Sequence, residues 1–134
     1  MMQGKRNKAQ FATEFIVLIA FMFIIFLSFT AIIASKVLDS RENARQQIAE
    51  DIAALAKNEI ELAESVSDGY LRVFNLPQTV EGNTYGISII GNRELVVSYI
   101  DKEHVLFLED NIVGNLAIGD NTIRKQNGIV YINI

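Results

Sequence analysis

A single carboxylate, Glu14, lies directly before a long apolar run, and its position suggests chemistry more strongly than that of any other residue. Gln10 is four residues earlier, so on a helix the two side chains would share one face. A carboxylate at the edge of an apolar environment costs free energy unless it is paired. A helix amino end close by would favour it through the macrodipole. By itself, Glu14 is better explained as the last polar residue before a membrane anchor.

The rest of the chain offers little for catalysis or metal binding. His104 is the only histidine and there is no cysteine, which excludes the common zinc sites and any disulfide framework. The turns at 109–111 and 120–121 are rich in side-chain oxygens, but they lack EF-hand spacing and such residues are common in turns. No glycine-rich phosphate loop or nucleophile elbow is present. We therefore expect no enzymatic activity, no metal and no cofactor.

Residues 15–34 form an apolar segment whose only polar side chains are Ser28 and Thr30. As a helix it would be roughly 30 Å long, which matches the hydrocarbon core of a bilayer. Apolar residues occur on all sides of it, so no face is suited to water. The two hydroxyls can bond back to helix carbonyls and so cost little. The segment predicts a helix that lies in lipid or inside a protein bundle.

Basic residues Lys5, Arg6 and Lys8 precede this segment. The positive-inside rule therefore predicts a cytoplasmic amino terminus with the bulk of the chain outside. A cleaved secretory signal fits poorly, because the apolar stretch is too long and 32–34 is a poor small-x-small site. A plain signal anchor fits the hydropathy, and the choice depends on the residues immediately before the segment. The net charge of −4 predicts no nucleic-acid partner.

The junction KRNKAQFATEFIVL resembles the class III signal peptide of archaeal type IV pilin-like proteins. In that family a short basic leader ends in a small residue, the mature chain often begins with Gln, and its fifth residue is Glu. The resemblance implies that Ala9 ends the leader, that Gln10 begins the mature chain, and that Glu14 is the fifth-position glutamate. At the position of Ala9, glycine is the commoner residue in the family. It also implies cleavage by a prepilin peptidase.

Cleavage at this junction has chemical consequences that follow from the residues themselves. The basic leader would hold the junction at the cytoplasmic lipid surface, with each Lys or Arg contributing about 1 kcal/mol. A small residue such as Ala9 can pass a narrow protease subsite. Cutting leaves the helix attached and creates an α-ammonium at Gln10, which could pair with Glu14 of the same chain or of a neighbour. Pairing between neighbours would set the axial register of packed helices.

The elements that position this pair begin with a long helix. No Gly or Pro occurs between Lys5 and Asp68, and no proline breaks the apolar half, so we predict an unbroken helix that Asp68-Gly69 ends. Beyond residue 35 the pattern becomes amphipathic. The predicted buried stripe comprises Val37, Leu38, Ala44, Ile48, Ile52, Leu55, Ala56, Ile60, Ala63 and Val66.

From Tyr70 onward, short β-branched runs alternate with turn signals. The predicted strands are 70–74, 84–90, 94–100, 105–108, 112–118, 122–125 and 129–132. Gly91-Asn92 and Asn127-Gly128 should form tight hairpin turns. One face of the sheet should pack on the helix through Ile87, Ile89, Leu95, Val97 and Tyr99. The fold class is therefore α+β, a long N-terminal helix, transmembrane and then amphipathic, with a small antiparallel β-rich C-terminal head.

The complete prediction has four segments: a cleaved leader at 1–9, a transmembrane and filament-core helix at 10–34, its amphipathic continuation at 35–68, and the head at 69–134. The family resemblance implies a structural pilin that polymerises into a helical surface filament with the help of an assembly ATPase and a platform membrane protein. The precursor would be membrane-anchored and the mature protein extracellular. Alternatives are a minor pilin, a subunit of a related secretion filament, or a single-pass anchored extracellular domain that binds or regulates and never polymerises.

Overall fold

The computed structural model describes the backbone of residues 3–134 and the side chains of residues 7–134. Helix α1 (Gln3–Ser65) is helical at every residue, which confirms the prediction of an unbroken helix. The chain divides into two compact units, one reaching Arg41 and the other comprising Glu42–Ile134, and α1 contributes to both.

In the first unit, the described residues belong to α1 alone. Its large apolar side chains are exposed on every side, from 39% at Ile25 to 71% at Phe11. The Ser28 hydroxyl donates a hydrogen bond to the carbonyl of Ile24 at 2.8 Å, and Thr30 bonds in the same way to Phe26 at 2.9 Å, as predicted. By length and composition α1 can cross a membrane.

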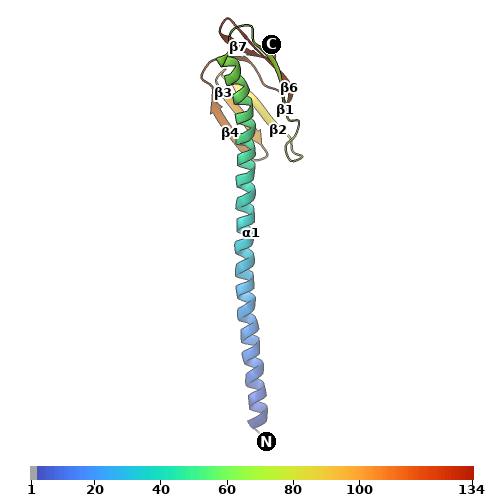
Figure 1. Cartoon of the computed structure of the whole chain (residues 1–134). Helices are drawn as coiled ribbons and strands as arrows, with labels where there is room; N and C mark the ends of the chain where they lie inside the picture. Colours follow the sequence, from blue (N-terminus) through green and yellow to red (C-terminus); the bar gives the residue numbers. More distant parts are fainter. Residues whose placement is uncertain (1–2) are drawn as a thin grey trace. The chain divides into compact units, whose positions relative to one another are not determined.

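The second unit contains the C-terminal part of α1 and seven strands, which lie beside it in Figure 1. The strands are β1 (Leu71–Leu76), β2 (Tyr85–Ile90), β3 (Glu94–Tyr99), β4 (Lys102–Phe107), β5 (Ile112–Gly114), β6 (Gly119–Gln126) and β7 (Ile129–Ile132). They form a four-stranded sheet in the order β1-β6-β7-β5 and a three-stranded sheet in the order β2-β3-β4. The α+β class and the β-rich head are therefore confirmed.

Most strands lie where the sequence predicts them, but several boundaries differ; β1 extends to Leu76, beyond the predicted 74, and β6 begins at Gly119, before the predicted 122. The predicted strand 112–118 is wrong beyond Gly114, because Gly114 has a φ of 108° and the Asn115 side chain then binds the Ile89 and Leu116 amides. The strand predicted at 94–100 ends at Tyr99, since Ile100 has a φ of 56° and starts the turn into β4. Strand β4 begins at Lys102, three residues before the predicted start at 105. One pairing, β5 with β7, is parallel.

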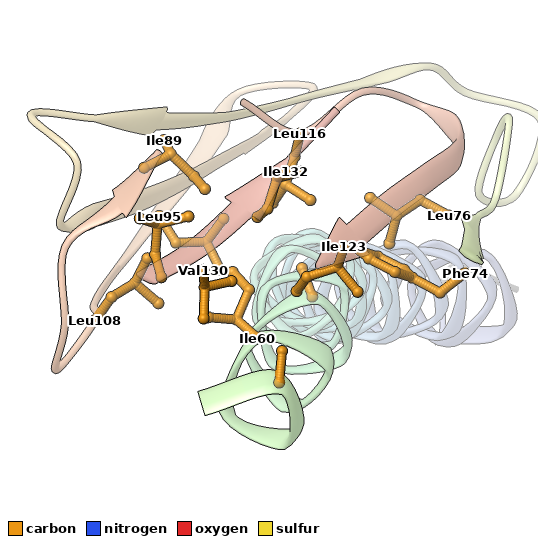
Figure 2. Packing of buried hydrophobic residues seen from close by; sticks show 13 residues of the cluster. Ile60, Phe74, Leu76, Ile89, Leu95, Leu108, Leu116, Ile123, Val130 and Ile132 are labelled. Atoms are coloured by element: carbon orange, nitrogen blue, oxygen red, sulfur yellow. The ribbon is translucent and has the colours of Figure 1, made fainter. Parts of the chain in front are cut away.

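The core forms where both sheets pack on the second half of α1, as Figure 2 shows around Ile60. The predicted sheet face is confirmed at Leu95, Val97 and Tyr99, which are 0–1% exposed. On the helix, the buried residues are mostly small: Ala49, Ile52, Ala53, Ala56, Ile60 and Ala63. Four residues of the predicted stripe are instead exposed: Leu55 at 45%, Val37 at 46%, Leu38 at 64%, and Ala44. The buried stripe therefore begins later on the helix and is centred on the alanines.

The carboxyl end of α1 is fastened to the hairpin that β6 and β7 form. The Lys125 ammonium donates to the carbonyls of Glu64 at 2.6 Å and Val66 at 2.9 Å. These are carbonyls that a helix end leaves without an internal partner, and a cation there also complements the helix dipole. The Asp68 carboxylate accepts a hydrogen bond from the Gly128 amide at 2.9 Å. The β6–β7 hairpin therefore caps the carboxyl end of the helix and holds it to the sheet.

Glu64, beside this cap, should make the head less stable as the pH rises. Burial raises its pKa, and the negative charges of Asp110, Glu109 and Glu61 raise it further. Between the ordinary pKa of a glutamate and the raised pKa of Glu64, the folded state holds a proton that the unfolded state has released. The free energy of unfolding therefore falls as the pH rises through this window. Replacing Glu64→Gln should raise the melting temperature at pH 7 by up to about 3 °C, after solvent screening is allowed for.

Thermal melts of the mature chain in detergent, followed by circular dichroism at pH 4 and pH 7, would measure this effect. The gain from Glu64→Gln should be small at pH 4 and larger at pH 7. Glu103→Gln, on exposed β4, serves as the matched control and should leave both melting temperatures unchanged. A Glu64→Gln gain that is equal at both pH values would contradict the assignment.

Candidate functional site

The residues predicted to act together near the amino end of α1 lie on one face of the helix. The Gln10 side-chain amide donates a hydrogen bond to Glu14 Oε1 at 3.2 Å. Both side chains are exposed in the first unit. The structure thus brings the Gln10 and Glu14 side chains together in the uncut chain. Cleavage would add a cation at a different atom, the backbone nitrogen of Gln10, one helical turn before Glu14.

The Ala9–Gln10 peptide bond lies inside α1, since the helix begins at Gln3. The Ala9 carbonyl accepts a hydrogen bond from the Thr13 hydroxyl at 2.9 Å. A protease that needs an extended backbone must therefore unwind this turn and break that bond before it can cut. The sequence analysis did not single out Thr13, although a threonine four residues after a carbonyl is a known back-bonding signal.

Glu14 marks the boundary between a polar and an apolar part of the helix surface. Asn7, Gln10 and Phe11 line a recess on its amino-terminal side, while Val17, Leu18 and Phe21 are among the residues that line an apolar recess on the other side. In an apolar environment the carboxylate could stay charged only with a partner. An ammonium at Gln10 would be such a partner and would itself gain from the same pairing.

Of the three basic residues predicted to hold the leader at the membrane surface, Lys8 is exposed on α1. The side chains of Lys5 and Arg6 lie outside the described residues. Their expected role therefore remains a prediction from the sequence.

In the head, the structure does not gather the polar residues into a reactive group. His104, on β4, is directly opposite Val97 of β3. Across residues 7–134, no group of three or more His, Asp or Glu side chains could hold a metal ion. The two oxygen-rich turns have different roles. In one, Asn121 is buried and forms hydrogen bonds with backbone groups of its own turn. In the other, the negative charges of Asp110 and Glu109 raise the pKa of Glu64.

A second surface, missed by the sequence analysis, lies on the head. Ile48, Ile52 and Leu55 of α1 and Pro77 and Val80 of the loop after β1 line an open apolar groove of about 210 Å³. Asp51 stands at its rim. The sequence contains a signal for this groove, because Ile48, Ile52 and Leu55 lie beside a separate stripe of alanines on the helix. The prediction assigned the aliphatic residues and the alanines to a single buried face.

Comparisons with protein-family models, with curated proteins and with solved structures give no match for this chain. The architecture itself, a long apolar amino-terminal helix followed by a small β-rich domain, fits that of a pilin-like protein. The helix is also compatible with membrane anchoring.

Proposed function

We propose that this chain is the structural subunit of an archaeal type IV pilus-like surface filament. A prepilin peptidase would cut the Ala9–Gln10 bond, and the mature chain would wait in the membrane with its head outside. Polymerisation through the apolar part of α1 would then place the heads on the filament surface. An assembly ATPase and a platform membrane protein would drive the process, as the resemblance of the junction implies.

The observation that carries this proposal is the contrast between the two parts of α1. From Phe15 to Ile33 the large apolar side chains are exposed on all sides, whereas from Ala49 to Ala63 the helix is the core of a folded head. The first part needs apolar surroundings and finds none in its own unit. Lipid and a bundle of identical helices are interchangeable for such a surface, so a subunit can move from one to the other with little loss of hydrophobic stabilisation.

The Gln10–Glu14 pair gives this transfer a direction and a register. Cleavage would convert the amide nitrogen of Gln10 into an ammonium at the start of the helix, one turn before the Glu14 carboxylate. In lipid the pair can remain near the headgroups, but in a filament core it is desolvated. A charge pair formed between neighbours is then the arrangement that avoids a buried unpaired charge. Docking at any other axial offset would leave both groups unpaired.

Mass spectrometry of the protein recovered from the cell surface tests the proposal directly. We expect an amino terminus at Gln10 and filaments in which this chain is the dominant band. Replacing Ala9→Leu should block cutting, because the larger side chain no longer fits a subsite made for small residues, and it should remove the chain from filaments. Ala12→Leu, two residues beyond Gln10 and equally exposed, is the matched control and should be processed normally.

An intact amino terminus on a chain that functions at the surface would contradict the proposal, and so would cleavage near Ala34. Either result would favour the alternative, a single-pass anchored extracellular domain that does not polymerise. That alternative rests on the same apolar helix, which by length and composition is also sufficient for an anchor. A processed chain that is only a trace component of filaments would indicate a minor pilin.

A further inference from the structure

The apolar groove of the head, defined above by Ile48, Ile52, Leu55, Pro77 and Val80, has the features of a docking site. Leu55 is 45% exposed and contributes little to the core beneath it, where the neighbouring alanines make the contacts. A single exposed leucine is common on protein surfaces and carries no argument by itself. Instead, the groove gathers several aliphatic side chains into one concave surface on the head.

The single charge at the groove is informative about what fills it. The Asp51 carboxylate accepts a hydrogen bond from the Gln47 amide at 2.9 Å. Among the residues that the structure describes, four ion pairs form, and none includes Asp51. An apolar groove with one acidic rim residue favours an occupant that is mostly aliphatic and carries one adjacent cation.

Residues near the end of the apolar segment have this composition. Ile33 and Val37, one turn apart on α1, are 60% and 46% exposed; Lys36 lies beside them, and Arg41 lies one turn beyond Val37. None of the four ion pairs among the described residues includes Lys36. Two aliphatic side chains at i and i+4 form a ridge of the kind that packs into grooves between side chains of another element.

We propose that the head groove of one copy receives the Ile33–Val37 ridge of a second copy, with Lys36 of that copy paired with Asp51. This inference rests on the proposed function, since it requires that the chain assembles. Each copy carries both the groove and the ridge, and the two surfaces differ, so the contact is heterologous, which is the type that an open helical filament requires. It adds a contact between head and helix to the packing of helix on helix.

Cysteine cross-linking tests this contact well because the chain contains no natural cysteine. The double variant Ile33→Cys with Leu55→Cys, assembled into filaments and mildly oxidised, should give a ladder of disulfide-linked multimers. Each single variant should give none, and a mixture of the two single variants should stop at dimers. Leu62→Cys with Ile33→Cys is the matched control: Leu62 is on the same helix and 39% exposed but lies outside the groove, so no ladder should form.

Charge reversal gives an independent readout. Asp51→Lys alone and Lys36→Asp alone should each lower the yield of filaments by at least about tenfold, since each places like charges together. The double reversal should restore the yield to within about threefold of the unmodified chain, because the pair is re-formed with its signs exchanged. Thermal melts of each variant would show whether the head remains folded.

Three results would overturn the contact between groove and ridge. One is a filament that forms normally but shows no ladder and additive charge effects, which would leave the proposed function intact. Another is an equal ladder from the Leu62→Cys control. The third is protection of Leu55→Cys from a water-soluble maleimide already in membranes before assembly, which would assign the groove to lipid. If the unmodified chain forms no filaments and keeps its first nine residues, the proposed function itself fails.

Discussion

Replacing Glu14→Ala is expected to stop filament assembly while leaving processing and the head unchanged. The ammonium created at Gln10 would then enter an apolar core without a partner, and breaking a buried pair in this way costs on the order of 3–5 kcal/mol. Such a cost corresponds to a loss of more than about a hundredfold in an equilibrium constant. Because the site is at the edge of the apolar segment, we expect the filament yield to fall by at least about tenfold.

Counting filaments by electron microscopy, together with mass spectrometry of the membrane fraction, would measure assembly and cleavage separately. Glu14→Gln keeps the shape and the hydrogen-bonding capacity but removes the charge, so it should fail almost as completely as Glu14→Ala. Asp39→Asn, which removes an exposed carboxylate elsewhere on α1, is the matched control and should assemble normally. Normal filaments from processed Glu14→Ala chains would show that the pair does not direct assembly.

Replacing Asn121→Ala should cause the largest loss of head stability among polar substitutions. The Asn121 side chain is 1% exposed and takes part in four hydrogen bonds. Its carbonyl oxygen accepts from the Ala117 amide and from the Asn133 side chain, both at 2.8 Å. Its amide donates to the carbonyls of Ala117 at 2.7 Å and Gly119 at 3.0 Å. Alanine would leave these buried partners unsatisfied.

An unsatisfied buried polar group costs about 1–3 kcal/mol, so the total loss should reach roughly 3 kcal/mol. For a head of this size that corresponds to a fall of more than about 10 °C in the melting temperature. Asn75→Ala is the matched control: its exposed side chain makes one bond, to Asp120 at 2.7 Å, and its loss should cost less than about 1 kcal/mol. Equal melting temperatures for the two variants would contradict the role given to Asn121.

Much of the fold could be predicted because its signals are local. The absence of Gly and Pro between Lys5 and Asp68 predicted the unbroken helix, and alternation of apolar residues predicted the faces of β2 and β3. The Asn127-Gly128 turn is confirmed, with both residues at positive φ as a tight hairpin turn requires. In each case the residue types restrict the backbone without help from distant parts of the chain.

The parts that escaped prediction depend on contacts between distant residues. Asn115 ends β5 because its side chain binds the Ile89 amide, 26 residues away in the sequence, and no local pattern shows such a partner. Leu55 fits a helical stripe as well as Ile52 does, and only the packing of the sheets decides that the stripe is centred on the alanines. The parallel pairing of β5 with β7 likewise follows from the order of the strands in the sheet.

The candidate site shows the same division. The spacing of Gln10 and Glu14 was sufficient to predict that they share a helix face, and their hydrogen bond is present in the uncut chain. The bond from Thr13 to the Ala9 carbonyl is equally local but was missed, since a threonine in a helix carries no single meaning. The groove beside Leu55 could not be foreseen, because it requires the loop at Pro77 to lie against α1.

The place of β7 has a consequence for how such a head matures. This last strand lies between β6 and β5 in the four-stranded sheet, and β5 has no other partner in that sheet. A chain threaded across a membrane helix first would deliver Ile129–Ile132 after every other strand. In such a chain the four-stranded sheet could be completed only once this final segment had been delivered, whereas the β2-β3-β4 sheet does not depend on it.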